Sequence, residues 1–223
     1  EIHGRTHNIW IAISLGNKFF TNENIEKFLR WALIHTKECI LVLICDEINR
    51  FNIEVFDNRS SAASMRNALR LGEEKLIDII KVISHLDKQD QKRVEVIRWK
   101  EISNSEIFDK RLKLVRDEYE LNPKFREAII EIIKKGRPDK VEKILSLSAD
   151  KLNRLAEYVL SEIPLFVDAV FYKGVLYTAI PYPGVTKLDE MFIGLQNRTM
   201  FPELAEKLEI RNSELEIEPT LII

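Results

Sequence analysis

The hydrophobic positions of the chain form two kinds of pattern, short continuous runs and longer stretches with helical spacing. Residues 9–13 and 39–45 are apolar runs of strand length, and each is followed by polar residues. Such runs are typical of strands that are buried on both faces. Between them, Thr21 or Asn22 can cap a helix. Its apolar residues recur at helical spacing: Ile25, Phe28, Leu29, Ala32 and Leu33. A strand, a helix and a second strand in this order predict a parallel crossover unit.

The rest of the chain continues this alternation with more helix than strand. Helical patterns cover residues 60–86, 105–121, 123–135 and 139–163. The first of these has an apolar stripe of Met65, Leu69, Leu76, Ile79, Ile80 and Ile83. Strand patterns cover residues 94–99 and 169–180, the latter as one or two strands with a turn at Lys173 and Gly174. The order predicts an α/β fold in which helices flank a mostly parallel sheet, as a single domain over residues 1–223.

Composition restricts the class of protein. The chain has 223 residues, a formal net charge of -2, 45% hydrophobic residues and two cysteines. No apolar run reaches the roughly 18 residues that a membrane-spanning helix needs, and the first residues are polar rather than a secretory signal. We therefore expect a soluble cytoplasmic protein without a membrane partner. Cys39 and Cys45 would share one face of a strand, which favours buried free thiols over a disulfide.

The loop of residues 14–20 is the first candidate site, because ligands of parallel α/β folds bind at the carboxyl ends of the strands. Gly16 in this loop is not part of a G-x-G-x-x-G run or a Walker motif. The chain also has no H-E-x-x-H and no paired C-x-x-C. We therefore expect neither a cofactor nor a metal.

Two groups of residues could carry chemistry. Ser14 directly follows the first predicted strand, where a hydroxyl could act as a nucleophile that forms an acyl intermediate. A turn serine that satisfies local backbone groups is the alternative. Tyr158 and Glu162 are four residues apart, so they would share one helical face. A carboxylate among apolar neighbours has a raised pKa and could bind an ammonium group or transfer its proton. The alternative is a surface pair on an amphipathic helix.

Taken together, these segments resemble the tRNA-dependent cyclodipeptide synthases. The resemblance rests on Ser14-x-x-Asn17 after the first strand, on a Y-[LVI]-x-x-E-x-P motif at residues 158–164, and on Tyr182. It extends over nearly the whole chain in order and spacing. It implies a Rossmann-like domain similar to the catalytic domain of class I tyrosyl- and tryptophanyl-tRNA synthetases, without their ATP-binding motifs. Members join two aminoacyl groups, taken from two aminoacyl-tRNAs, into a cyclic dipeptide.

The resemblance also implies a role for each matching residue. Ser14 would accept the first aminoacyl group, and Tyr158 and Glu162 would hold its α-amino group. Glu162 would also transfer a proton when that amine attacks. Tyr182 would assist the later proton relay and cyclisation, and Asn17 would position the loop and the second substrate. An aminoacyl ester is already activated, so its transfer to a serine needs orientation and proton handling but no ATP or metal.

The chain departs from the family pattern at two places. The family usually has H-x-[LVI]-[LVI]-G-[LVI]-S at the nucleophile, whereas here the glycine position is Ala12 and the histidine position is Asn8. His7 lies one residue out of register. One subfamily has His directly after the late tyrosine, where this chain has Pro183. We therefore expect a divergent member in which the proton relay differs in detail.

The pocket for the first aminoacyl side chain is expected beside the nucleophile strand. Trp10 and Ala12 would project from the same strand face as Ser14, and Leu165 and Ile180 could complete an apolar wall. A tryptophan there, together with alanine in place of glycine, would reduce the volume and favour a small first side chain. The alternative is that Trp10 fills the core beneath the sheet.

The even charge balance hides a local asymmetry. Residues 59–116 contain 14 Lys+Arg and nine Asp+Glu, while residues 203–223 contain six acidic and two basic residues. A tRNA partner requires phosphate contacts from lysine and arginine. The best candidates lie in or just before one predicted helix: Arg59, Arg66, Arg70 and Lys75. A mixed-charge solvated helix face is the competing interpretation.

Two other functions compete with cyclodipeptide synthesis. A Rossmann-like module could bind tRNA or another ligand without acyl transfer. A serine hydrolase is the second rival, but the chain lacks a G-x-S-x-G elbow and has no obvious base among His3, His7, His35 and His85. The intact set of Ser14, Tyr158, Glu162 and Tyr182 favours catalysis over a degenerate binding module. We also expect a monomer.

Overall fold

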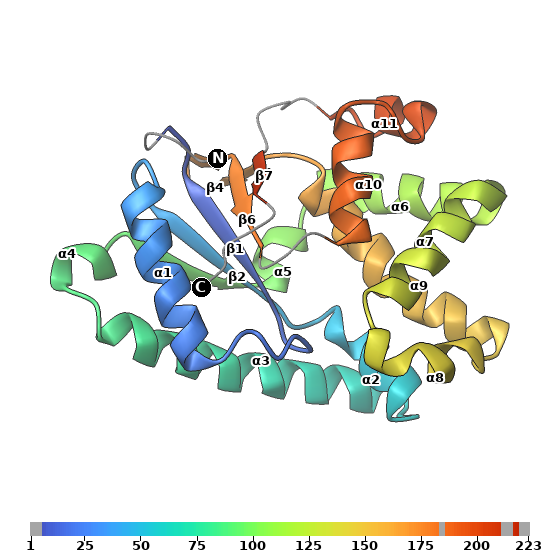
Figure 1. Ribbon diagram of the computed structural model, residues 1–223, viewed down its shortest axis with the longest axis horizontal. Helices are drawn as coiled ribbons and strands as arrows, with labels where there is room; N and C mark the ends of the chain where they lie inside the picture. The colour runs from blue at the N-terminus through green and yellow to red at the C-terminus, as the bar shows by residue number, and fades with distance from the viewer. Residues whose placement is uncertain (1–5, 183–185, 211–215, 219–223) are drawn as a thin grey trace.

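A five-stranded parallel sheet lies at the centre of the computed structural model (Figure 1). The structure describes residues 6–182, 186–210 and 216–218, with only the backbone of Pro138 and of residues 216–218. The sheet has the order β3-β2-β1-β6-β7. Its strands are β1 (Ile9–Ser14), β2 (Ile40–Cys45), β3 (Val94–Arg98), β6 (Ala179–Pro181) and β7 (Glu216–Glu218). The strand order changes direction beside β1, and in open parallel sheets the crevice at such a point binds ligands.

The predicted strands at residues 9–13, 39–45 and 94–99 are confirmed with small shifts at their ends. β1 and β2 are in register from Ile9↔Ile40 to Ser14↔Cys45, which places the last residues of the two strands side by side. Trp99 belongs not to β3 but to the first turn of the next helix. Both cysteines are free thiols; Cys45 is buried and Cys39 is half-buried.

One face of the sheet is covered by the helices α1 (Asn22–His35) and α3 (Ser61–Ser84), and the short helix α4 (Lys88–Gln91) follows them. Thr21 caps α1 through its side chain, and all five of its predicted apolar residues are buried. The predicted apolar stripe of α3 is partly wrong. Ile80 is 54% exposed, and the buried face begins with the small residues Ser64, Ala68 and Gly72. Small side chains allow this part of α3 to pack closely against α2 and against Asp46 after β2.

The other face is covered by a larger group of helices that surrounds α9 (Figure 1). They are α2 (Asn49–Phe56), α5 (Trp99–Ser103), α6 (Glu106–Leu121), α7 (Pro123–Lys135), η1 (Pro138–Lys140), α8 (Val141–Leu145), α9 (Ala149–Phe166), α10 (Lys187–Gln196) and α11 (Pro202–Lys207). The helices predicted over residues 105–121 and 123–135 are confirmed. The single helix predicted over residues 139–163 is wrong, because η1, α8 and α9 are separate and Ser148 caps α9 through its side chain.

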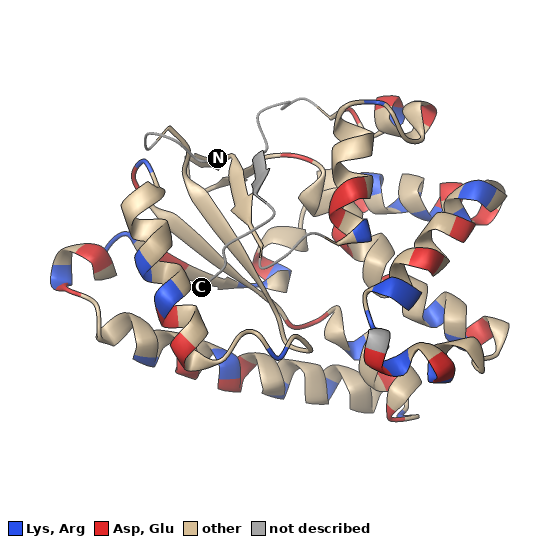
Figure 2. Cartoon of the chain, in the orientation of Figure 1, with Lys and Arg blue, Asp and Glu red and all other residues tan. Residues whose placement is uncertain are grey.

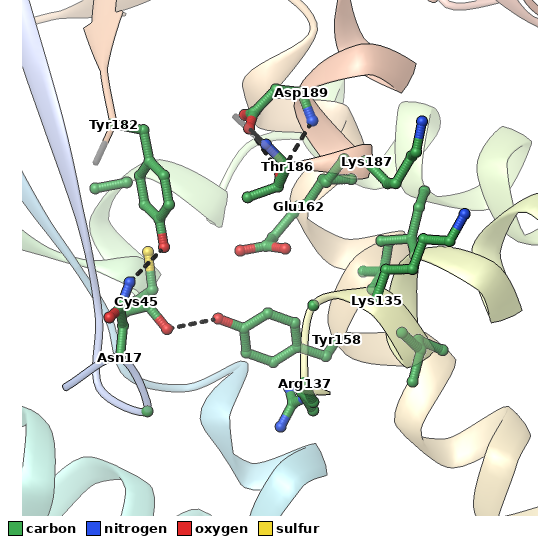
Figure 3. Close-up of a pocket in the computed structure, with 18 of the residues that line it drawn as sticks. Asn17, Cys45, Lys135, Arg137, Tyr158, Glu162, Tyr182, Thr186, Lys187 and Asp189 are labelled. Carbon is green, nitrogen blue, oxygen red and sulfur yellow. Dashed lines mark hydrogen bonds between the residues drawn. The ribbon is translucent and has the colours of Figure 1, made fainter. Parts of the chain in front are cut away.

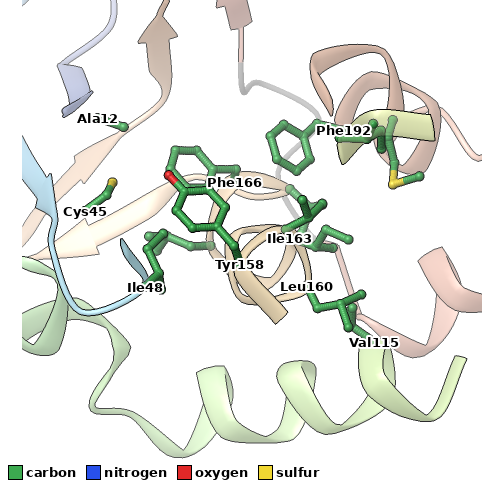
Figure 4. Close-up of a cluster of buried hydrophobic side chains, with 14 of the residues drawn as sticks. Ala12, Cys45, Ile48, Val115, Tyr158, Leu160, Ile163, Phe166 and Phe192 are labelled. Carbon is green, nitrogen blue, oxygen red and sulfur yellow. The ribbon is translucent and has the colours of Figure 1, made fainter. Parts of the chain in front are cut away.

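The core on this side is built around aromatic side chains. Trp10 stacks on Phe166 at 4.9 Å between ring centroids, and Phe166 stacks on Phe192 at 5.7 Å. Figure 4 shows Tyr158, Phe166 and Phe192 in this core, with Ala12 and Cys45 toward the sheet. Trp10 therefore fills the core under β1, which is the alternative that the sequence left open.

The segment of residues 169–180 contains three strands rather than one or two. β4 (Val170–Tyr172) and β5 (Val175–Tyr177) form an antiparallel hairpin, and β6 then joins the main sheet beside β1. The turn is at Lys173 and Gly174, with φ angles of 46° and 83°. Both angles are in the left-handed region that favours glycine at a tight hairpin turn.

A closed polar cluster joins β2, β3 and α3 at the carboxyl edge of the sheet. Asp46 is fully buried, and its carboxylate accepts a hydrogen bond of 2.6 Å from Nε of Arg98. Arg98 also donates to Glu73 and to the carbonyl oxygen of Leu69 on α3. A Cβ atom at Gly72 would lie 2.5 Å from Cβ and Oδ2 of Asp46, so only glycine fits there without a shift. No helix in the described part of the chain is long and apolar enough to cross a membrane.

Candidate active site

A cavity of about 740 Å³ opens at the carboxyl end of β1. Its walls come from β1 and the following loop, the segment between α7 and α8, the cavity side of α9, and the first turn of α10. Figure 3 shows Tyr182, Asp189, Glu162 and Tyr158 around the same space. The cavity therefore lies at the crevice that the strand order indicates.

Ser14 and Tyr158 meet in this cavity although they are far apart in the sequence. Ser14 is the last residue of β1, and its Oγ lies 3.2 Å from the hydroxyl oxygen of Tyr158 on α9. Tyr158 is buried, and this burial raises the pKa of its phenol well above its usual range, with the charge of Glu162 as the next cause. Tyr158 is therefore a neutral hydrogen-bonding group at neutral pH, able to donate one proton and to accept another.

Glu162 lies one helical turn beyond Tyr158, on the same face of α9, and its carboxylate points into the cavity (Figure 3). Burial raises the pKa of Glu162 to about 8. The positive charge of Arg137 opposes this rise, the negative charge of Asp189 adds to it, and a hydrogen bond with the Tyr158 hydroxyl opposes it. No ion pair with Glu162 occurs among the described residues. The predicted shared face is confirmed, and the carboxylate is poised to gain or lose a proton near neutral pH.

The loop after β1 is held by Asn17. Its Nδ2 donates to the hydroxyl oxygen of Tyr182 at 3.1 Å, and its Oδ1 accepts from the backbone N–H of Phe19 at 2.9 Å. Burial raises the pKa of Tyr182 to about 12. Asn17 and Tyr182 thus form a second pair beside Ser14 and Tyr158. Pro183, the departure from one subfamily, lies outside the described residues.

Arg137 is a cavity residue that sequence reasoning missed. It precedes η1, and its guanidinium group donates to Oδ1 of Asn52 at 2.6 Å and lies 5.7 Å from the ring centre of Tyr158. Burial lowers the pKa of this arginine, and the nearby Tyr158 and Glu162 oppose that effect. Its charge stabilises the ionised form of Glu162. Its signal in the sequence was weak, because an arginine after a helix-terminating glycine is usually a surface residue.

Asp189 and Thr186 were also missed. They form a capping box at the start of α10, in which the Asp189 carboxylate accepts from the backbone N–H and the hydroxyl of Thr186. The T-x-x-D spacing could have indicated the helix start, but not that it faces a cavity. Burial raises the pKa of Asp189.

The apolar wall of the cavity differs from the predicted one. Ala12 and Ile180 line it as expected. Trp10 and Leu165 are buried but do not line it, because the cavity opens at the end of β1 and Trp10 lies four residues before Ser14. Phe166 and Phe192 form the wall instead. Trp10 therefore gives no support to the prediction of a small first side chain.

The predicted tRNA-binding residues lie on or just before α3, outside the cavity lining. Arg59 and Arg66 are exposed, and Arg70 is paired with Glu74. Lys75 is only partly exposed and donates to the carbonyl oxygen of Phe20 at 3.0 Å, so it holds the loop after β1. Other cations line the cavity and were not predicted: Lys18, Lys135, Arg137, Lys140 and Lys187. Figure 2 shows basic residues among the segments from α7 to α8.

No histidine of the described residues lines the cavity. His7 is bonded to the hydroxyl of Thr178, and His35 packs against Trp31. His85 lies 3.7 Å from Glu26. His3 is outside the described residues. Within the described part of the chain, no group of His, Cys, Asp and Glu side chains could hold a metal ion. Because no described histidine lines the cavity, the geometry gives no support to a hydrolase triad around Ser14.

Comparison with protein families gives a match over residues 1–201 to the model described as cyclodipeptide synthase. The chain belongs to the cyclodipeptide synthase family. This membership confirms both the predicted family and the predicted enzyme class, an aminoacyltransferase of the cyclodipeptide synthase type. The search of curated protein sequences gives no significant match.

Solved cyclodipeptide synthases share the fold of this chain. The enzyme from Staphylococcus haemolyticus is 15% identical with a TM-score of 0.71, covering 97% of this chain and 91% of that one. A Mycobacterium tuberculosis protein, whose structure relates cyclodipeptide synthetases to type I tRNA synthetases, is 18% identical with a TM-score of 0.65, covering 85% and 79%. The enzyme from Candidatus Glomeribacter gigasporarum, bound to Phe-tRNAPhe, is 20% identical with a TM-score of 0.63, covering 96% and 88%. The predicted Rossmann-like α/β fold is confirmed.

Proposed function

We propose that this cyclodipeptide synthase joins two aminoacyl groups through an aminoacyl-enzyme on Ser14. The observation that carries the proposal is the 3.2 Å approach of Ser14 Oγ to the Tyr158 hydroxyl, in the cavity that also contains the Glu162 carboxylate. A nucleophile, a neutral phenol and a carboxyl group with a pKa of about 8 are the groups that acyl transfer to and from an amine requires.

The first step exchanges one ester for another. Ser14 Oγ attacks the carbonyl carbon of the first aminoacyl-tRNA, the bond from that carbon to the ribose oxygen breaks, and the serine proton passes to the ribose oxygen. Tyr158 can relay this proton, because its hydroxyl can accept one hydrogen bond while donating another. The ionised form of Glu162 attracts the α-ammonium group of the bound aminoacyl group.

The next steps form two amide bonds. The amine of the aminoacyl-enzyme loses a proton and attacks the ester of the second aminoacyl-tRNA. The bond from that carbonyl carbon to the ribose oxygen breaks, a second proton from the attacking nitrogen passes to the ribose oxygen, and the dipeptidyl ester stays on Ser14. The amine of the second residue then attacks this ester, which closes the ring and returns the proton to Ser14 Oγ. Glu162 takes the proton from the first amine, and Tyr182, oriented by Asn17, assists the closing step.

Two observations support a tRNA substrate: a structural neighbour bound to tRNA and the basic residues on the cavity wall. The fold neighbour from Candidatus Glomeribacter gigasporarum was solved with Phe-tRNAPhe. In this chain Lys135, Arg137 and Lys140 lie on one wall of the cavity, where they can contact the phosphates of an acceptor end. Arg66 and Arg70 on α3 remain the candidates for the more distant part of the tRNA. We propose action in the cytoplasm, because charged tRNAs are present there.

The decisive test is expression of the chain in a bacterium, followed by mass analysis of the medium for cyclic dipeptides. We expect a product from the parent chain and none from Ser14→Ala. Intact-mass analysis of the purified parent after incubation with an aminoacyl-tRNA should show an adduct that Ser14→Ala lacks. A folded parent that binds aminoacyl-tRNA, but gives neither product nor adduct, would favour a non-catalytic binding module.

A binding test separates the two basic regions. We expect salt-dependent binding of aminoacyl-tRNA that weakens in Lys135→Ala/Lys140→Ala and in Arg66→Ala/Arg70→Ala. Binding that is unchanged by the second pair would restrict the tRNA contact to the cavity wall.

A further inference from the structure

Besides the half-buried Glu162, the cavity contains a buried carboxylate that the steps above do not use. Asp189 is 9% exposed and lines the cavity near Glu162 (Figure 3). Both of its bonds to Thr186 are made by Oδ2. No hydrogen bond or ion pair from another described residue reaches Oδ1, so this oxygen can accept a bond from a ligand.

A helix cap does not require this burial. Ordinary capping carboxylates lie in the first turn of surface helices, where water solvates the remaining oxygen. Glu203 in the first turn of α11 is an exposed carboxylate, although it makes no capping hydrogen bond. The neighbouring cation Lys187 does not neutralise Asp189, because it pairs with Glu190. A buried carboxylate without a cationic partner destabilises the free protein, so its site is complementary to a positive group that arrives from outside.

The proposed reaction brings two ammonium groups into this cavity. The first belongs to the aminoacyl group on Ser14, for which Glu162 on α9 is the partner. The second belongs to the second aminoacyl substrate, and it remains as the free amine of the dipeptidyl ester. We infer that the free oxygen of Asp189, held by the Thr186 cap, binds this second α-ammonium group. The inference rests on the proposed function and assigns the subsite for its second substrate.

The carboxylates of Glu162 and Asp189 lie on different helices, which suits two ammonium groups that enter the cavity at different steps of the reaction. Glu162 projects from the C-terminal part of α9, one turn from Tyr158, whereas Asp189 projects from the start of α10. Asp189 accordingly acts after Ser14 has been acylated. Loss of the Asp189 carboxylate should slow the reaction with the second aminoacyl-tRNA and the ring closure. It should leave the formation of the first ester on Ser14 unchanged.

The test is Asp189→Asn, because an asparagine oxygen can still accept from Thr186 and cap the helix. We expect the aminoacyl-enzyme adduct on Ser14 to form at the parent level, while the yield of cyclic dipeptide falls at least about tenfold. Linear dipeptide or dipeptidyl-enzyme should rise relative to cyclic product. Glu203→Gln, which removes an exposed first-turn carboxylate from α11, is the matched control and should retain the parental yield.

Three results would overturn the inference in distinguishable ways. An unchanged yield of cyclic product in Asp189→Asn would show that the carboxylate has no role in substrate binding. A loss of adduct and product in equal proportion, together with a lower melting temperature, would show that Asp189 is only a helix cap. Absence of the adduct from the parent chain itself would reject the proposed function, and the inference with it.

Discussion

Two groups of buried or half-buried acidic side chains lie near the carboxyl edge of the sheet, and they differ in their partners. Asp46 at the end of β2 is bonded to Nε of Arg98 and to the backbone N–H groups of Glu47 and Trp99. Glu162 and Asp189 line an open cavity and have no ion-pair partner among the described residues. Burial alone therefore does not distinguish a structural carboxylate from a functional one. The distinction is whether the protein itself supplies a directly bonded opposite charge, as Arg98 does for Asp46.

The largest expected effect is the loss of catalytic rate when Glu162, which has no ion-pair partner among the described residues, is replaced. Glu162→Gln keeps the size of the side chain but cannot attract an ammonium group or accept its proton. We expect the initial rate of cyclic dipeptide formation to fall about 1000-fold, within the range for loss of an acid–base group. The control is Glu157→Gln on the same helix, where the carboxylate pairs with Arg116 away from the cavity. A rate within about threefold of the parent in Glu162→Gln would remove Glu162 from the mechanism.

The second effect is on the pH dependence of stability. Glu162 has a pKa of about 8 in the folded protein, against 4.5 for an unperturbed glutamate. The unfolded chain therefore releases this proton at a lower pH than the folded protein does. The free energy of unfolding should fall as pH rises from about 4.5 to about 8, by on the order of 5 kcal/mol from this group.

Urea denaturation of the parent and of Glu162→Gln across this range measures that contribution. The difference in stability should favour the variant increasingly up to pH 8 and then become constant. Asp189, Arg137 and Tyr158 also face Glu162, and both proteins contain them. A constant difference at all pH values would mean that Glu162 ionises normally.

Removal of the Asp46 carboxylate should lower the stability of the protein and leave its catalytic rate unchanged, the reverse of the expectation for Glu162. Asp46→Ala leaves Arg98 without its buried partner, and the arginine side chain is only 25% exposed. We expect a loss of about 3 kcal/mol in the free energy of unfolding, measured in urea at neutral pH. The rate of product formation per folded molecule should stay within about threefold of the parent. A large loss of rate without a loss of stability would place Asp46 in the reaction.

The sequence was most informative where local pattern determines position. The apolar run before Ser14 predicted β1 and therefore placed the serine at the sheet edge. The spacing of Tyr158 and Glu162 predicted a shared helical face, and both line one cavity. The same spacing rule misplaced Trp10, because it specifies the face of a strand but not the depth along it.

Residues that reach the cavity through tertiary packing could not be predicted. Asp189 belongs to a capping box that looks like an ordinary surface helix start, and only the docking of α10 beside α9 buries it. The break between α8 and α9 was missed for a related reason. The segment at residues 146–148 fits the helical spacing, and the cap by Ser148 competes with continuation of the helix.

The smallest expected effect concerns the packing around the paired carboxylate. Gly72→Ala would place a methyl group 2.5 Å from Cβ of Asp46, where no flexible side-chain end can move away. Overpacking of this kind costs about 1 to 3 kcal/mol, while replacing glycine by alanine inside a helix gains up to about 1 kcal/mol. We therefore expect a net loss of about 1 kcal/mol in the free energy of unfolding. Gly16→Ala is the control for the substitution itself, because no atom lies within 4 Å of its added Cβ. A gain in stability for Gly72→Ala would show that α3 can move away from Asp46, and the closed cluster would then be looser than the distances indicate.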